Sequence, residues 1–112
     1  MITFELLRST PLDKGFAAEV LFEHDQMKVR RIELAAGARI PPCQMQEDAV
    51  FVVLGGRVTF RADEQETPVV PPGAVFIPGG ATTRSMEAHE ASLVLAVLCR
   101  RGPEREGGAR QP

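Results

Sequence analysis

Hydrophobic and polar residues alternate in short runs through the middle of this chain. Residues 57–61 alternate strictly, and residues 67–70 and 74–77 form two further extended runs. A period of two residues is typical of a β-strand with one buried face. The polar segment 62–66 separates the first two runs and is predicted to be a turn.

Other runs of the same kind lie on both sides of this region. Residues 49–54 are mostly β-branched or aromatic, and Gly55-Gly56 is predicted to end them in a hairpin turn. Residues 16–23 and 27–35 are also extended, with a turn at 24–26 between them. In the second of these runs, charged residues interrupt the alternation, which indicates either a bulge or a polar neighbour on one face.

The two ends of the chain are less regular. Residues 92–100 are apolar at both parities, which predicts a strand buried on both faces, although a buried helix has a similar pattern. Residues 2–7 fit either a strand or a helical turn, and residues 101–112 are predicted to be a disordered tail. Together, about eight to ten short strands point to an all-β sandwich or small barrel over residues 1–100.

Composition narrows the class of protein. The chain has 112 residues, enough for one domain, with a net charge of −2. That charge gives no electrostatic footprint for nucleic acid or a membrane surface, and we expect neither as a partner. No apolar run is long enough to span a bilayer, and no signal peptide is visible. Cys43 and Cys99 are therefore expected to be reduced thiols in a cytoplasmic protein.

The most specific pattern lies between Gly37 and Gly56. The residues are Gly37, then Cys43-Gln44-Met45 after a gap of five, Ala49 after a gap of three, and Gly56 after a gap of six. A second pattern follows at residues 78–83, which read Pro-Gly-Gly-Ala-Thr-Thr. These two stretches resemble the motifs of the cupin family, in particular its small RmlC-like members, which are double-stranded β-helix (jelly-roll) barrels. The resemblance covers roughly residues 20–99.

The resemblance stops at the metal ligands. In metal-bearing cupins, two histidines, a glutamate and a third histidine hold a divalent ion inside the barrel. The matching positions here are Cys43, Met45, Ala49 and Thr83. None of them offers the imidazole or carboxylate that Mn²⁺, Fe²⁺ or Zn²⁺ prefers. The resemblance therefore implies a cupin barrel without metal or other cofactor.

One metal-binding alternative stays open. Cys43 and Met45 are two residues apart, so on a strand they face the same side, and a thiolate with a thioether suits Cu(I). Glu47 shares their parity and could replace the lost carboxylate if the strand stays regular. Otherwise Cys43 and Met45 are apolar walls and Glu47 lies in the loop that follows.

Other polar residues offer fewer prospects for chemistry. His24 and His89 both fall in predicted turns, so we expect them at the surface rather than acting as bases. Cys43 has no neighbour in sequence that would activate it as a nucleophile. Arg31 and Glu33 could anchor an anionic ligand if they point inward, but an ion pair on the outer or dimer-facing surface is favoured.

The inward-facing positions define the predicted binding site. Alternation places Val53 on the same side as this site, directs Ser85 inward and turns Arg84 outward. The predicted ligand-binding residues are Cys43, Met45, Glu47, Ala49, Phe51 and Thr83.

The predicted function is binding of a small organic molecule by a homodimeric, metal-free cupin. A cupin-type enzyme of sugar or small-metabolite biosynthesis, an isomerase, epimerase or oxygenase-like protein, is the alternative. Such an enzyme would need Glu47, Arg31 or Cys43 as its polar group, and a soft metal at Cys43 and Met45 belongs to the same alternative. A filled barrel that serves only as an interaction domain is the third reading.

Overall fold

The computed structural model describes residues 1–6, 15–80 and 82–100. The predicted tail at residues 101–112 lies outside the described residues. Nine strands are present, and they are named here in chain order: β1 (Phe16–His24), β2 (Met27–Leu34), β3 (Arg39–Gln44), β4 (Asp48–Gly55), β5 (Val58–Ala62), β6 (Gln65–Val69), β7 (Gly73–Ile77), β8 (Thr83–Ala88) and β9 (Ser92–Cys99). Among the described residues there is no helix that could cross a membrane.

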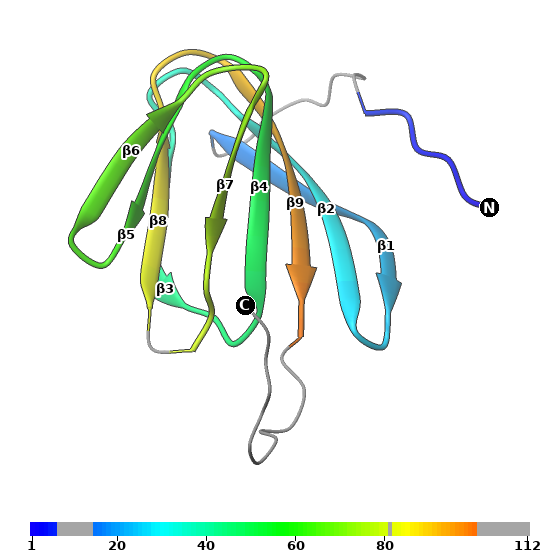
Figure 1. Cartoon of the computed structure of the whole chain (residues 1–112). Helices are drawn as coiled ribbons and strands as arrows, with labels where there is room; N and C mark the ends of the chain where they lie inside the picture. Colours follow the sequence, from blue (N-terminus) through cyan, green and yellow to red (C-terminus); the bar gives the residue numbers. More distant parts are fainter. Residues whose placement is uncertain (7–14, 81, 101–112) are drawn as a thin grey trace.

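The strands form two antiparallel sheets that lie face to face (Figure 1). One sheet has five strands in the order β1-β2-β9-β4-β7, and the other has four in the order β3-β8-β5-β6. Figure 1 shows the four-stranded sheet on the left and the five-stranded sheet on the right. The predicted all-β barrel is therefore confirmed.

The core fills the space between the sheets. Its buried hydrophobic residues are Ile32, Leu34, Ala49, Phe51, Val53, Val58, Phe60, Ile77, Met86, Ala88, Val94, Ala96 and Leu98. Phe51 of β4 and Phe60 of β5 join the two sheets, with ring centroids 5.3 Å apart. Ala49, Phe51 and Val53 share the inner face, as their alternation predicts.

The central position of β9 explains why its two parities are both apolar. β9 pairs with β2 on one side and with β4 on the other. Its inward side chains Val94 and Ala96 are buried, whereas Leu93 and Leu95 on the outer face are only half-buried. The strand prediction is confirmed, and burial on the outer face is partial in the described chain.

Three local predictions need correction. The Gly55-Gly56 turn does not close a hairpin, because β4 and β5 belong to different sheets and the chain crosses between them there. The β5–β6 turn is shorter than residues 62–66, since β6 already begins at Gln65. Residues 2–6 form neither a strand nor a helical turn, and residue 7 lies outside the described part.

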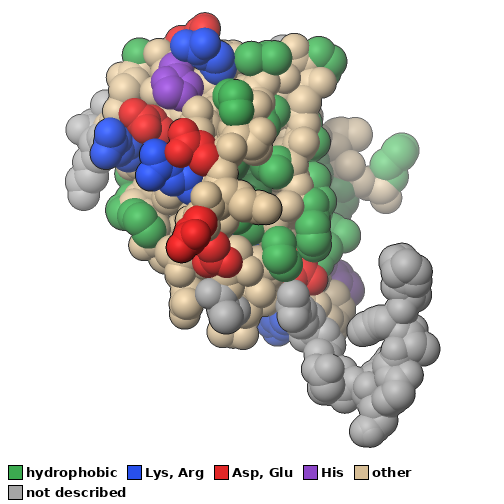
Figure 2. Space-filling view, turned by 60° about the vertical axis from the view of Figure 1, so that its left-hand side comes forward, with side chains coloured by type: hydrophobic (Ala, Val, Ile, Leu, Met, Phe, Trp, Pro, Cys, Tyr) green, Lys and Arg blue, Asp and Glu red, His purple; other side chains and the backbone are tan. Residues whose placement is uncertain are grey.

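The outer faces of the two sheets differ in polarity. The four-stranded sheet carries the ion pairs Arg39–Glu87 and Arg61–Glu66. The five-stranded sheet carries exposed Val50 and Phe76, which are directly paired in register across β4 and β7. In the view of Figure 2, charged side chains gather on the left and hydrophobic ones lie through the middle and right.

Candidate binding cavity

A small cavity lies inside the barrel and is walled by both sheets. Its volume is about 140 Å³. The residues that line it are Phe16, Ala18, Arg30, Ile32, Ile40, Cys43, Met45, Phe51, Phe60, Ile77, Arg84, Ser85, Met86, Ala96 and Leu98. This lining is mostly apolar and, within residues 1–6, 15–80 and 82–100, includes no aspartate or glutamate. Arg30 and Arg84 are the lining residues that carry a charge at every ordinary pH.

Three of the six predicted site residues line this cavity. Cys43 lies near the end of the edge strand β3, Met45 directly follows that strand, and Phe51 comes from the centre of β4. The double proline Pro41-Pro42 falls where the β3–β8 register shifts, between Ile40 and Cys43. Proline lacks a donor for the ladder and is tolerated at an edge strand or a bulge. Cys43 is exposed, so the cavity opens along this edge.

The other three predicted residues lie elsewhere. Ala49 is packed in the core and is 1% exposed, so it closes the barrel without reaching the cavity. Glu47 follows β3 in the loop, because the strand ends at Gln44. Glu47 contacts the site through its backbone carbonyl, which accepts a hydrogen bond from Arg84.

Thr83 is held at the start of β8 by its backbone. Its amide donates to Asp63 Oδ1 at 2.9 Å, and its carbonyl accepts from the Asp63 amide at 2.7 Å. Its side chain is not part of the cavity lining. Thr83, which matches the fourth ligand position of the cupin motif, thus bonds to the β5–β6 turn through its backbone and places no group inside the barrel.

The predicted orientation of the Arg84 side chain is wrong. It was expected to point outward, but it is 5% exposed and lines the cavity. On β8 the buried residues are Arg84, Met86 and Ala88. The two apolar members of this set fix the inner parity, and Arg84 follows it. The apolar residues Met86 and Ala88 indicate this inward parity in the sequence itself. They are a better guide to the orientation of Arg84 than the assumption that Thr83 points inward.

The Arg84 guanidinium is only partly satisfied by the protein. Its Nη1 donates to the carbonyls of Glu47 at 2.9 Å and Ile77 at 3.3 Å. Its Cζ lies 6.0 Å from the centre of the Phe51 ring, at the outer limit of a cation–π contact. Its Nη2 is buried and has no hydrogen-bond partner among the described residues.

Burial dominates the electrostatics of this group. Removal from water lowers the pKa of the Arg84 guanidinium, because desolvation penalises the charged form. The acidic groups of Cys43, Glu47 and Asp48 oppose this lowering of the pKa. An arginine side chain keeps its proton in proteins even so. The cavity therefore contains a fixed positive charge.

The neighbouring arginines of β2 face opposite ways. Arg31 lies on the outer face, where it donates to Glu33 at 2.9 Å and to the Leu6 carbonyl at 2.7 Å. The favoured interpretation, an ion pair on an outer sheet surface, is confirmed for Arg31 and Glu33. Arg30 has the inner parity and lines the cavity. Its Nε is buried and has no hydrogen-bond partner within the described chain.

The donor set of the barrel does not fit a divalent cation. The metal-ligand positions of the cupin motif present a thiol, a thioether, a methyl group and a hydroxyl, and the hydroxyl lies outside the cavity lining. No group of three or more His, Cys, Asp or Glu side chains that could hold a metal occurs in the described ranges. A buried guanidinium in the same cavity would also repel a second cation. These residues favour an anion over a metal ion.

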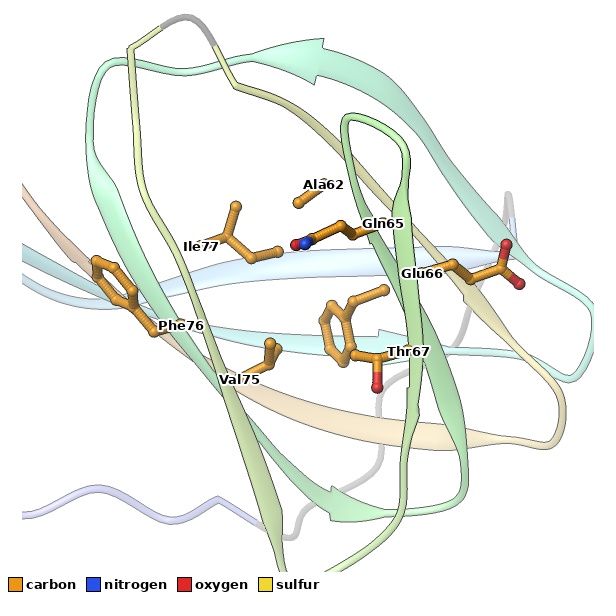
Figure 3. A pocket seen from close by; sticks show the side chains of 8 residues that line it. Ala62, Gln65, Glu66, Thr67, Val75, Phe76 and Ile77 are labelled. Atoms are coloured by element: carbon orange, nitrogen blue, oxygen red, sulfur yellow. The ribbon is translucent and has the colours of Figure 1, made fainter.

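A second hollow lies between the sheet edges β6 and β7 and has a volume of about 420 Å³. In Figure 3, Gln65 and Ile77 project into it, whereas Phe76 and Glu66 lean away. Phe60 and Ile77 line both hollows and form the wall between them. None of the six predicted site residues lines this outer hollow, which is wider and open to solvent.

Both histidines are exposed, as expected. His24 ends β1 and stacks on Phe22, with ring centroids 6.3 Å apart. His89 follows β8 and its Nε2 shares a hydrogen bond of 2.6 Å with Thr59 Oγ1. Neither lines the cavity. Cys43 and Cys99 are both free thiols.

Comparison with known proteins places this geometry among the cupins by structure. No family model matches the sequence, and no curated protein matches it. An RmlC-like cupin protein from Desulfovibrio desulfuricans superimposes with a TM-score of 0.79 at 22% identity, over 88% of this chain and 96% of the other. A cupin superfamily protein from Desulfitobacterium hafniense does so with a TM-score of 0.75 at 14% identity, over 83% and 84%.

A third similar structure is a domain of a regulator. It is the Cupin_2 domain of an XRE family transcriptional regulator from Enterobacter cloacae, with a TM-score of 0.69 at 16% identity, over 79% of this chain and 99% of that one. At these identities the likeness concerns the fold. Two face-to-face antiparallel sheets with this strand order and these neighbours identify the architecture: the chain has the cupin fold in its small, RmlC-like form.

Proposed function

We propose that this protein binds a small organic molecule inside its barrel. The observation that carries the proposal is the cavity of about 140 Å³, enclosed by apolar side chains and open beside Cys43 on the β3 edge. Ligand sites in proteins are typically concave and mostly apolar, with a few polar groups that fix orientation. Arg30 and Arg84 are the polar groups of this kind.

The size of the cavity limits the ligand. Sites for drug-sized molecules have volumes of roughly 300–1,000 Å³. An engineered apolar cavity of about 150 Å³ binds benzene. The expected ligand is therefore a molecule of about that size, well below a sugar nucleotide.

Binding is favoured over catalysis by the residues available. The described residues that line the cavity include no carboxylate or histidine that could act as a general acid or base. The candidate nucleophiles among the described lining residues are Cys43, which lies at the exposed edge, and Ser85, and neither has a base beside it in the lining. A binding or sensing module is consistent with the use of this fold in the domain of the Enterobacter regulator. A cupin-type enzyme of small-metabolite biosynthesis is the second candidate.

The proposal is tested by blocking the cavity from one strand. Ala17 and Ala18 are neighbours on β1, but Ala18 lines the cavity and Ala17 faces outward opposite Glu33. Thermal denaturation is followed with a panel of small aliphatic and aromatic compounds. A compound that binds the folded protein should raise Tm in proportion to the logarithm of its concentration above Kd.

Ala18→Phe is expected to abolish this stabilisation, because the ring occupies the cavity. The matched control Ala17→Phe places the same ring on the outer face and should leave it unchanged. The proposal is wrong if no compound of this size stabilises the wild type at millimolar concentration, or if both variants respond like the wild type. Elemental analysis of protein purified without chelators accompanies the assay, since a stoichiometric metal would contradict a metal-free site.

A further inference from the structure

Arg30 and Arg84 line the same cavity, and each has a buried nitrogen without a hydrogen-bond partner among the described residues. Arg84 Nη2 and Arg30 Nε each have almost no exposed surface and no hydrogen bond within the described part of the chain. A buried donor that is left unsatisfied costs about 1–3 kcal/mol, and more when it is charged. Folded proteins rarely leave such groups without a purpose or an unseen partner.

The rest of Arg84 is fixed. The two carbonyls that accept from Nη1 belong to Glu47, in the loop before β4, and to Ile77, at the end of β7. These bonds orient the guanidinium plane, and the Phe51 ring lies on one side of it. The donor that remains is therefore held in place before any ligand arrives, and pre-organisation of this kind favours binding.

Among the described residues, no carboxylate that lines the cavity neutralises this donor. Glu47 and Asp48 lie close enough to interact electrostatically with Arg84, but neither lines the cavity. Asp48 Oδ1 accepts from the Gly79 amide at 2.8 Å instead. On the outer face, Arg31 has the carboxylate of Glu33 as its partner. The neighbouring Arg30 has a buried Nε without a hydrogen-bond partner among the described residues.

We propose that the cavity is a site for a small organic carboxylate, with Arg84 Nη2 and Arg30 Nε as the donors to its carboxylate group. The apolar part of the ligand packs against Phe16, Ile32 and Leu98. This inference rests on the proposed binding function and names its ligand class. A carboxylate suits two unsatisfied donors and apolar walls, whereas a phosphate, with more charge and more acceptor oxygens, would be left partly unpaired.

The experiment compares two ligands of the same shape and different charge. Benzoate and benzamide are both about the size of the cavity, and their binding is measured by titration calorimetry and by the rise in Tm. Sodium sulfate at equal ionic strength controls for a general effect of anions. Benzoate is expected to bind at least about tenfold more tightly than benzamide, since hydrogen bonds from a charged donor to a charged acceptor are roughly twice as strong as neutral ones.

Variants assign the preference to the arginine. Arg84→Met keeps an apolar side chain of similar length and should bind benzoate no better than benzamide. Arg84→Lys keeps the charge but loses the planar fork, so benzoate binding should weaken about tenfold. Arg30→Met should weaken it less. Arg61→Met removes an exposed arginine paired with Glu66 on the outer face, and should bind benzoate as the wild type does.

The outcomes separate the two proposals. Equal binding of benzoate and benzamide by the wild type, with both lost in Ala18→Phe, retains the cavity function and overturns the carboxylate inference. A preference for benzoate that survives in both Arg84→Met and Arg84→Lys also overturns it. Stabilisation by sulfate equal to that by benzoate would indicate a general anion effect and overturn it as well. Failure of every small compound to bind overturns the proposed function itself.

Discussion

At the scale of single residues, arginines account for most of the unexpected features of this protein. Arg31 and Arg84 are both buried, at 2% and 5% exposure. Arg31 has a carboxylate and a backbone carbonyl as partners, whereas Arg84 is satisfied on one nitrogen only. A buried arginine that is paired with a carboxylate serves stability, and a cavity-lining arginine with an unpartnered nitrogen is suited to a ligand.

This difference predicts unequal costs of substitution in the absence of ligand. Arg31→Met should lower the free energy of unfolding by about 2–3 kcal/mol, because it removes the ion pair of 2.9 Å between Arg31 and the half-buried Glu33. Arg84→Met should change it by no more than about 1 kcal/mol, since the lost hydrogen bonds are offset by removal of a desolvated charge. Urea denaturation measures both.

Arg61→Met serves as the control for both variants. Arg61 and Glu66 are more than half exposed, and pairs of this kind contribute at most about 1 kcal/mol. A cost for Arg84→Met as large as that for Arg31→Met would show that Arg84 is chiefly structural.

At the scale of elements, the crossings between sheets depend on glycine. Gly56 connects β4 to β5 with a φ of 84°, and a Cβ there would meet the carbonyl of Ala91 and the backbone of Ser92. Ser92 Oγ accepts from the Arg57 amide at 3.1 Å, which keeps the turn before β9 tight against this crossing. Both the positive φ and the close approach exclude a side chain at this position.

Gly37 shares the positive φ of Gly56 but not the close approach of neighbouring backbone. Its φ is 83°, close to that of Gly56, but no atom lies within 4 Å of the position of a Cβ. Gly37→Ala should therefore cost about 1–2 kcal/mol, the strain of the left-handed conformation alone. Gly56→Ala should cost at least about 2 kcal/mol more, because backbone atoms must move as well.

Chemical denaturation of the two variants gives the comparison. If Gly37→Ala folds and Gly56→Ala does not accumulate as folded protein, the larger cost at Gly56 is confirmed in a stronger form. Equal costs for the two variants would mean that the β4–β5 crossing and the β8–β9 turn do not pack as closely as described.

At the scale of the whole molecule, the two outer faces suggest how the barrel associates. The outer face of the five-stranded sheet is mostly apolar across β9, β4 and β7 and carries the Arg31–Glu33 ion pair on β2, whereas the outer face of the four-stranded sheet carries the ion pairs Arg39–Glu87 and Arg61–Glu66. On the apolar face, Phe76 is 58% exposed and Val50 is 38% exposed. We propose that a second copy of the chain covers this face, since a two-fold axis buries the same patch on both copies.

Substitution of one exposed residue on this face tests the homodimer. Phe76→Lys should convert the dimer to a monomer in sedimentation velocity at micromolar concentration, because a charge would be buried without a partner. Val70→Lys is the matched control: Val70 is 55% exposed but lies in the β6–β7 connection. A wild type that is monomeric, or a Phe76→Lys variant that stays dimeric, would contradict this arrangement.

Much of the architecture could be predicted from the sequence because strand periodicity is a local property. Alternation at residues 49–54 and 57–61 and the apolar run from residue 92 correspond to β4, β5 and β9. The spacing of the cupin motifs identified the fold. Sheet assignment was less accessible, since Gly55-Gly56 has the composition of a hairpin turn and only the partners of β4 and β5 show that the chain crosses between sheets there.

For the site, too, some features could be predicted from the sequence and others only from the tertiary structure. The sequence by itself predicted that the positions matching the cupin metal ligands carry no histidine or carboxylate and that Cys43, Met45 and Phe51 share an inner face. Only the tertiary structure decided that Arg84 and Arg30 line the cavity, that Glu47 contributes a carbonyl, and that Thr83 is tied to Asp63. The physical reason is that residue identity and periodicity are encoded locally, whereas the partner of a buried charge comes from strands that are distant in the chain.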